Sequence, residues 1–191
     1  MQEVIDVLGR NGAIAVIPTD TVYGVVARAS DEQAVNRLYE LKQRHHKPGT
    51  LIAASIDQLV TLGIPRRYLK AVEQYWPGAV SVVIPCGPAL EYLAQGQHSL
   101  AIRIPNKPGL LQLLEQTGPL LTSSANRPGE PTATNVAAAR EYFGDDVDYY
   151  QDGGNLEGHA PSTVIRIIDD AVEVLRAGAV TINPETGAVE T

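Results

Sequence analysis

Short unbroken runs of apolar residues alternate along the chain with stretches in which apolar positions recur every three or four residues. The first run, Ala13 to Ile17, has no polar residue and stops at Pro18, which is typical of a strand buried on both faces inside an α/β sheet. Comparable runs predict further strands at residues 25–27, 51–54, 79–84, 99–104, 119–123, 147–150, 163–168 and 172–175.

The stretches between these runs have the spacing of amphipathic helices. They predict helices over residues 2–10, from 31 to about 42, from 56 onward, and over 65–75, 110–116 and 136–143. Ser30 and Ser55 precede two of them and are expected as N-caps, because a serine side chain can accept a hydrogen bond from the first helical turn. Since strands and helices alternate without a long linker, we expect a single α/β domain over residues 1–191, with a twisted, open, mixed β-sheet flanked by helices.

The charge balance is acidic and uneven along the chain. The 15 Lys and Arg residues against 22 Asp and Glu residues give a net charge of −7, which argues against a protein that coats nucleic acid non-specifically. Residues 28–70 are nevertheless rich in Lys and Arg, whereas the chain beyond Arg140 is rich in Asp and Glu. A basic half followed by an acidic half indicates a local anionic ligand.

Signals for a membrane, a disulfide or a zinc site are absent from the sequence. No apolar run reaches the roughly 18 residues of a membrane span, and the N-terminus is acidic where a signal peptide would be basic. We therefore expect a cytoplasmic protein without a membrane contact. The single cysteine, Cys86, excludes an internal disulfide, and none of the 4 histidines has the spacing of a zinc ligand.

Polar residues follow the first strand, at the edge where open α/β sheets bind ligands. Thr19, Asp20, Thr21 and Tyr23 supply hydroxyls and a carboxylate just beyond Pro18. The same residue types are common in plain turns, so a ligand site and a structural turn remain alternatives at this stage. Asp20 has the same two interpretations, as a contact to a metal or an amine, or as a turn residue.

Lys42 and Arg44 form the most informative basic pair. Residues two apart on a helix point about 200° from each other, so both side chains can serve one anion only if the helix ends near Lys42. Pro48 and Gly49 favour such an ending. A lysine and an arginine together suit a polyphosphate, although cations also pair with helix C-termini for structural reasons alone.

Two arginines and a polar run also end predicted strands. Arg103 lies in an apolar strand, where an unpaired guanidinium is costly, so it must meet a carboxylate of the protein or of a ligand. Arg176 leaves a strand at a turn and has the same two interpretations. The run Thr122 to Asn126 ends another strand with small hydroxyls and an amide that can both donate and accept hydrogen bonds.

The chain resembles the YrdC-like family of threonylcarbamoyl-AMP synthases in six motifs, which follow the family's order over nearly the whole chain: PTDTVYG at 18–24, LKQR at 41–44, WPG at 76–78, LAIRIP at 100–105, TSSAN at 122–126 and LRAG at 175–178. The resemblance implies a twisted, open α/β sheet with a concave basic cavity. It also implies that L-threonine, bicarbonate and ATP give threonylcarbamoyl-AMP and pyrophosphate, for modification of the tRNA adenosine next to the anticodon.

The resemblance also implies roles for individual residues. Catalysis is assigned to the pair Lys42 and Arg44. ATP would be bound by Lys42, Arg44, Ser99, Asn126, Thr134 and Arg176, and L-threonine by Thr19, Arg103, Ser124 and Ser162. Mg²⁺ is expected to come with ATP, and no metal site made of protein ligands is expected. Because the chain stops shortly after Arg176, it resembles the short single-domain form, and other tRNA threonylcarbamoyl-transfer proteins are expected partners.

Two loops depart from the family pattern. His45-His46 follow Arg44 where the family commonly has proline, and Arg127-Pro128 follow Asn126 where a serine is usual. The contacts that these loops make with substrates therefore remain open.

Two other functions remain as alternatives. The first is a non-catalytic module that binds double-stranded RNA or takes part in ribosome maturation, which the basic residues 28–70 favour and the net charge of −7 and the 5% aromatic content oppose. The second is a carbamoyl-adenylate-forming module of the kind found in hydrogenase-maturation proteins, but the long accessory domains of those proteins are absent from this sequence.

Overall fold

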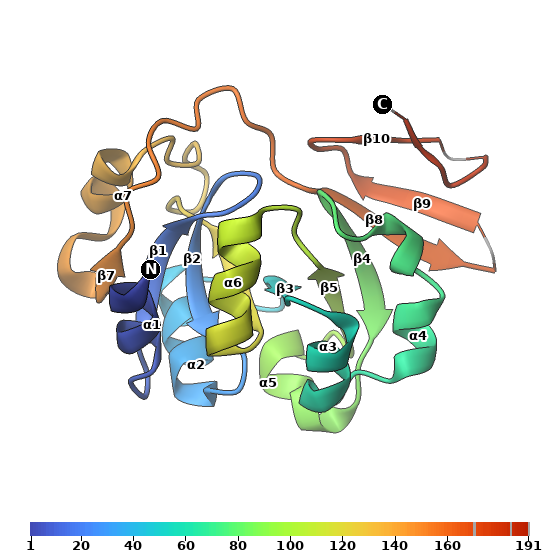
Figure 1. Ribbon diagram of the computed structural model, residues 1–191, viewed down its shortest axis with the longest axis horizontal. Helices are drawn as coiled ribbons and strands as arrows, with labels where there is room; N and C mark the ends of the chain where they lie inside the picture. Colours follow the sequence, from blue (N-terminus) through green and yellow to red (C-terminus); the bar gives the residue numbers. More distant parts are fainter. Residues whose placement is uncertain (170, 184, 191) are drawn as a thin grey trace.

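A computed structural model describes residues 1–169, 171–183 and 185–190. Within these ranges the strands form a nine-stranded sheet in the order β7-β1-β2-β6-β3-β5-β4-β8-β9 and a separate hairpin of β10 and β11 (Figure 1). The strands are β1 (Ile14–Pro18), β2 (Tyr23–Arg28), β3 (Thr50–Ile52), β4 (Val80–Pro85), β5 (Ser99–Arg103), β6 (Leu120–Ser124), β7 (Tyr149–Tyr150), β8 (Thr163–Ile168), β9 (Ala171–Arg176), β10 (Thr181–Ile182) and β11 (Val189–Glu190).

Short helices connect the strands. They are α1 (Gln2–Leu8), α2 (Glu32–Leu41), α3 (Ile56–Leu62), α4 (Arg66–Lys70), α5 (Glu91–Ala94), α6 (Pro108–Thr117) and α7 (Val136–Phe143), with 3₁₀ turns η1 (Glu73–Tyr75), η2 (Pro88–Leu90) and η3 (Gly144–Asp146). The large sheet is mixed, because β1 with β7, β3 with β5 and β4 with β8 run parallel while its other neighbouring strands run antiparallel. The predicted α/β fold with a mixed sheet and flanking helices is therefore confirmed.

The two faces of the sheet pack against different helices. Alternate residues of β1 belong to different hydrophobic clusters, with Ile14 and Val16 in the larger one and Ala15 and Ile17 in the smaller one, as expected when both faces of a strand are buried. The larger cluster includes residues of α2, α3, α4, α5 and α7, and the smaller one packs beneath α1 and α6, which lie next to each other in Figure 1.

The face under α1 and α6 also carries the polar residues of the site. Ile52 of β3 belongs to the smaller cluster, so Thr50, two residues earlier, points to the same side of the sheet. Leu120 of β6 also belongs to the smaller cluster, so Thr122 and Ser124, two and four residues later, point to this side as well. Along β3 and β6 this face therefore changes from apolar to polar, and the polar part lines a cavity.

The predicted boundaries lie within two residues of the observed ones for every predicted strand and for the helices at 110–116 and 136–143. Ser55 caps α3 as predicted, by accepting a hydrogen bond from the backbone N–H of Gln58. The prediction of Ser30 as a cap was wrong. The cap of α2 is the next residue, Asp31, whose carboxylate accepts from the backbone N–H of Ala34 at 3.0 Å and is a better partner for the helix dipole than a neutral hydroxyl.

The single helix predicted over 65–75 is also wrong, because α4 ends at Lys70 and η1 follows. Leu69, Val72 and Tyr75 are all buried, and their spacing of three residues suits the 3.0 residues per turn of a 3₁₀ helix better than a continuous α-helix. The helix predicted over 2–10 ends at Leu8, and α5, β10 and β11 were not predicted.

Candidate functional site

The turn between β1 and β2 uses its own hydroxyls. The Thr19 side chain donates a hydrogen bond to the carbonyl of Val22 at 2.6 Å and accepts from the backbone N–H groups of Thr21 and Val22, both at 3.2 Å. The Thr21 hydroxyl lies 3.1 Å from that of Thr19. Thr19 therefore lines the cavity with a hydroxyl that already has protein partners, and its binding of L-threonine stays a prediction.

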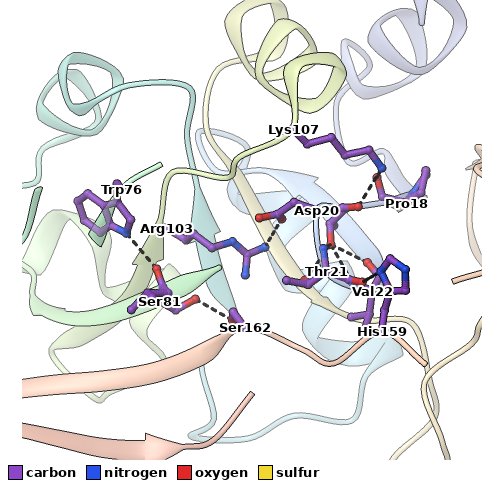
Figure 2. Close-up of polar contacts among 12 residues, drawn as sticks. Pro18, Asp20, Thr21, Val22, Trp76, Ser81, Arg103, Lys107, His159 and Ser162 are labelled. Carbon is purple, nitrogen blue, oxygen red and sulfur yellow. Dashed lines mark hydrogen bonds and ion pairs between the residues drawn. The ribbon is translucent and has the colours of Figure 1, made fainter. Parts of the chain in front are cut away.

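Arg103, at the end of β5, meets a protein carboxylate. One of its terminal nitrogens lies 2.9 Å from the Asp20 carboxylate, and the two side chains are only 3% and 5% exposed (Figure 2). Burial lowers the pKa of Arg103, and the nearby Asp20 carboxylate opposes that shift. The buried Nε of Arg103 has no hydrogen-bond partner, so the guanidinium keeps donor capacity beside the cavity that it lines.

Lys107 and Tyr23 stabilise the same corner of the site. Residue patterns alone did not single out Lys107 and suggested no partner for Tyr23. The Lys107 ammonium donates to the carbonyl of Thr19 at 2.9 Å, and Figure 2 shows Lys107 pointing toward the segment that contains Pro18 and Asp20. The Tyr23 hydroxyl donates to the carbonyl of Gly154 and accepts from the N–H of Gly153. Lys-Pro-Gly at 107–109 and Gly-Gly at 153–154 are common in loops, so the sequence carried no distinctive signal for these contacts.

Lys42 lies at the end of α2. This is the condition under which Lys42 and Arg44 can both reach one anion. Helix α2 stops at Leu41, Lys42 is its C-cap, and Gln43 has a left-handed backbone with φ of 48°. The chain therefore leaves the helix between Lys42 and Arg44, and both side chains line one cavity.

The Lys42 ammonium is buried among oxygens of the segment after β6. It donates to the carbonyls of Ser124 and Asn126 and, at 2.9 Å, to the side-chain oxygen of Asn126. Since an ammonium has three N–H donors, these three acceptors can take all of them. Burial, with a smaller contribution from Arg44, lowers the pKa of Lys42 to about 8.

Arg176, the last residue of β9, binds the segment that precedes β8. Its guanidinium donates to the carbonyl of Ser162 from two nitrogens, at 3.2 and 2.7 Å, and to the Ser162 hydroxyl at 3.2 Å. A Cβ at Gly178 would lie 2.2 Å from the carbonyl oxygen of Pro161, so this close approach of the two segments requires glycine. Burial and then the positive charges of Arg103 and Arg44 lower the pKa of Arg176, so Arg176 lies within the electrostatic reach of both.

Two cavities adjoin at Arg44 and Ser124, which line both. The first has a volume of about 190 Å³, below the roughly 300–1,000 Å³ of pockets for drug-sized ligands, so it suits a small molecule. The second has about 380 Å³. Of the predicted site residues, the first cavity contains Thr19, Arg44, Arg103, Ser124, Ser162 and Arg176, and the second contains Lys42, Arg44, Ser124 and Asn126 together with His45 and Lys47.

Ser99 and Thr134 line neither of these cavities. Ser99 begins β5 on the face that carries Ala101 and Arg103, and its hydroxyl donates to the carbonyl of Gln97 at 3.3 Å. Thr134 contributes its backbone carbonyl as an acceptor for the N–H of Leu156. Their assignment to ATP stays a prediction.

Neither a metal-ligand cluster nor a membrane-spanning helix occurs in the part of the chain that the structure describes. There is no group of three or more His, Cys, Asp and Glu side chains able to hold a metal ion. No helix there is long and apolar enough to cross a membrane.

Comparison with known proteins identifies similar chains. The model of the Sua5–YciO–YrdC family, described as "Telomere recombination", matches residues 8–178. A putative threonylcarbamoyl-AMP synthase of Mycobacterium tuberculosis is 36% identical over 174 residues, covering 88% of this chain and 80% of the relative. The threonylcarbamoyl-AMP synthase of Chromohalobacter salexigens is 37% identical over 172 residues, covering 87% and 91%.

A solved structure is similar over most of the chain. The crystal structure of P. abyssi Sua5 complexed with L-threonine superposes with a TM-score of 0.82 at 31% identity. The match covers 94% of this chain but only 54% of the Sua5 chain, so this chain spans about half the length of that relative.

Proposed function

The chain belongs to the Sua5–YciO–YrdC family, and on that premise we propose that it is a threonylcarbamoyl-AMP synthase, a nucleotidyltransferase that converts L-threonine, bicarbonate and ATP to threonylcarbamoyl-AMP, pyrophosphate and water. The product would serve the modification of the tRNA adenosine next to the anticodon. The names of curated relatives that cover most of their own length support this proposal.

The observation that carries the proposal is the junction of two unlike cavities at Arg44. The small cavity contains Arg103, whose charge is paired with the Asp20 carboxylate. The larger one contains Lys42, whose partners are oxygens of neutral groups. An amino acid in the first and a phosphate chain in the second would meet between them, which is the arrangement that adenylation of an amino-acid derivative requires.

The reaction needs little covalent chemistry from the protein. The amine of L-threonine takes up the carbon of bicarbonate as a carbamate, with loss of water. A carbamate oxygen then attacks the α-phosphorus of ATP, the new O–P bond forms, and the bond to the bridging oxygen of pyrophosphate breaks. In this proposal Arg103 binds the threonine carboxylate, and Lys42, Arg44 and Arg176 offset the negative charge of the phosphates while the reacting atoms are held in place.

Mg²⁺ is part of the proposal only as a companion of ATP. The described residues provide no cluster of carboxylates or histidines for a metal ion, and Asp20 is engaged by Arg103. We therefore assign no reaction step to a Mg²⁺ ion held by the protein. ATP in cells carries its own Mg²⁺, bound through phosphate oxygens.

Direct RNA binding without turnover is not favoured by these relatives, whose names describe synthases. Transfer of the product to tRNA would involve other threonylcarbamoyl-transfer proteins. A cytoplasmic location belongs to the same proposal, because ATP, L-threonine and tRNA meet there.

The test is pyrophosphate release by the purified protein with ATP, Mg²⁺ and bicarbonate, in the presence and absence of L-threonine. We expect release that depends on threonine and bicarbonate and is much weaker with L-serine. A folded sample that releases no pyrophosphate under any of these conditions, and that binds RNA in a salt-sensitive manner, would favour the RNA-binding function instead.

A further inference from the structure

Ser81, the second residue of β4, is a fully buried serine whose hydroxyl contacts a residue of the first cavity. Its exposed fraction is 0%, and that of Ser162 is 3%. The two hydroxyl oxygens lie 2.9 Å apart, as drawn in Figure 2. Within the described ranges of the chain, the Ser81 hydroxyl makes no other hydrogen bond to a side chain or backbone group.

The direction of this hydrogen bond follows from counting donors and acceptors. A serine hydroxyl has one proton to donate and two lone pairs to accept with. If Ser162 donated to Ser81, the Ser81 proton would be buried without an acceptor, which is unfavourable. Ser81 therefore donates to Ser162.

The second lone pair of Ser162 is also occupied. The guanidinium of Arg176 can only donate, and one of its nitrogens lies 3.2 Å from the Ser162 hydroxyl oxygen. With Ser81 on one lone pair and Arg176 on the other, the Ser162 hydroxyl can accept nothing more. Its own proton is the one group left, and Ser162 lines the cavity.

We propose that Ser81 and Arg176 together fix Ser162 as a hydrogen-bond donor to the ligand, so that the ligand must present an oxygen acceptor and not an ammonium at this wall of the cavity. This inference rests on the proposed function, in which that ligand is L-threonine. The acceptor is then an oxygen of its carboxylate or of its side-chain hydroxyl. Ser81 is a positioning residue, because it acts through Ser162 without touching the ligand.

The test compares Ser81→Ala, Ser162→Ala and the double variant in steady-state pyrophosphate release. We expect Ser81→Ala to raise the KM of L-threonine about fivefold, the effect of weakening one neutral hydrogen bond, with the KM of ATP within twofold of the wild type. Ser162→Ala should raise the KM of L-threonine about tenfold. The double variant should match Ser162→Ala, because Ser81 has no other route to the ligand.

Two controls separate positioning from folding. Ser81→Thr keeps the hydroxyl and should restore the wild-type KM. Ser55→Ala removes a helix cap at a residue that lines neither cavity, and should lower the melting temperature while leaving both KM values unchanged. If Ser81→Ala raises the two KM values equally, or if its effect multiplies with that of Ser162→Ala, the positioning role is overturned.

Substrate analogues identify the acceptor oxygen. With L-2-aminobutyrate, which lacks the hydroxyl, the penalty of Ser81→Ala should vanish if Ser162 donates to that hydroxyl. With (R)-1-aminopropan-2-ol, which keeps the amine and the hydroxyl but lacks the whole carboxyl group, it should vanish if Ser162 donates to the carboxylate. A penalty that persists with both analogues would overturn the inference.

Calorimetric titration of L-threonine into the full chain measures the threonine affinity of the wild type and of Ser81→Ala without turnover. A wild type that releases no pyrophosphate but binds threonine more tightly than Ser81→Ala would overturn the proposed function and support the inference. Absence of threonine binding by the wild type would overturn both. Normal turnover and binding in Ser81→Ala would overturn the inference alone.

Discussion

The two ends of the site hold their cations in opposite ways. At the Arg103 end, the guanidinium lies 2.9 Å from a carboxylate that is itself buried. At the Lys42 end, the ammonium is surrounded by two carbonyls and an amide oxygen, which carry dipoles but no charge. Across the described residues, none of Lys42, Arg44 and Arg176 takes part in an ion pair.

This difference matches two kinds of ligand. The pair of Arg103 and Asp20 offers one group for a ligand carboxylate and one near a ligand amine, which suits a zwitterion such as an amino acid. Cations held only by dipoles keep their full charge, and a polyanion would relieve the repulsion from Arg103 and Arg44 that lowers the pKa of Arg176. The proposed site for L-threonine therefore contains an arginine that is paired with a protein carboxylate. The proposed site for the ATP phosphates contains a lysine that has only neutral partners.

The largest expected effect comes from uncoupling the paired end. Asp20→Asn keeps the shape of the side chain but leaves Arg103 buried without a counter-charge, so we expect the free energy of unfolding to fall by about 3–5 kcal/mol. Chemical denaturation measures it. The matched control is Asp57→Asn, since Asp57 pairs with Arg66 at 2.6 Å but is 80% exposed, and should lose about 0–1 kcal/mol. Equal losses in the two variants would mean that the Arg103 end is not a desolvated pair.

Substitution of Lys42, at the unpaired end, should lower the activity more than the stability. Lys42→Met retains the length of the side chain and removes the charge, and we expect kcat/KM for ATP to fall by about 10²–10³, because a buried positive charge that stabilises the phosphates is lost. Pyrophosphate release measures this fall. Lys70→Met, which removes an exposed lysine paired with Glu73, is the control and should leave the rate unchanged. A loss of less than about threefold in Lys42→Met would show that Lys42 serves only the fold.

The pH dependence sharpens the same contrast. Because the pKa of Lys42 is lowered to about 8, its ammonium is charged below that pH and neutral above it. We therefore expect kcat/KM for ATP, which reports the free enzyme, to be constant below about pH 8 and to fall about tenfold per unit above it. The residual activity of Lys42→Met should lack this fall. A wild-type rate that stays constant up to pH 9.5 would contradict the assignment.

The smallest expected effect is at the support of the paired end. Lys107→Met removes the bond from its ammonium to the carbonyl of Thr19, and we expect the free energy of unfolding to fall by about 1 kcal/mol because Lys107 is partly exposed. The KM of L-threonine should rise while that of ATP stays constant. A change in the KM of ATP instead would place Lys107 with the other end of the site.

The fold was largely predictable because its signals are local. The apolar run of β1, the cap at Ser55 and the boundaries of α7 depend on neighbouring residues alone. The division of residues 65–75 into α4 and η1 depends on which side chains are buried against the sheet. The local sequence does not reveal which side chains those are.

Most residues of the site could be predicted from the sequence, but the hydrogen bonds and ion pairs that they make could not. The residues that line the two cavities follow from motifs that end strands. The partner of Arg103 lies 83 positions earlier in the chain, and the acceptors of Lys42 lie 82 and 84 positions later. Such pairings depend on the strand order, which brings β1, β6 and β5 into one sheet. Residue spacing carries no information about the strand order.

The wall formed by Arg176 and Gly178 has a consequence during synthesis of the chain. A ribosome releases the N-terminal strands first, and β8 and β9 follow only after most of the chain has emerged. Since Arg176 lines the first cavity and closes it against Ser162, a nascent or prematurely terminated chain that ends before this point has no complete binding site. Ligands stabilise only the state that binds them, so such incomplete products would gain no protection from substrates and would stay open to proteolysis.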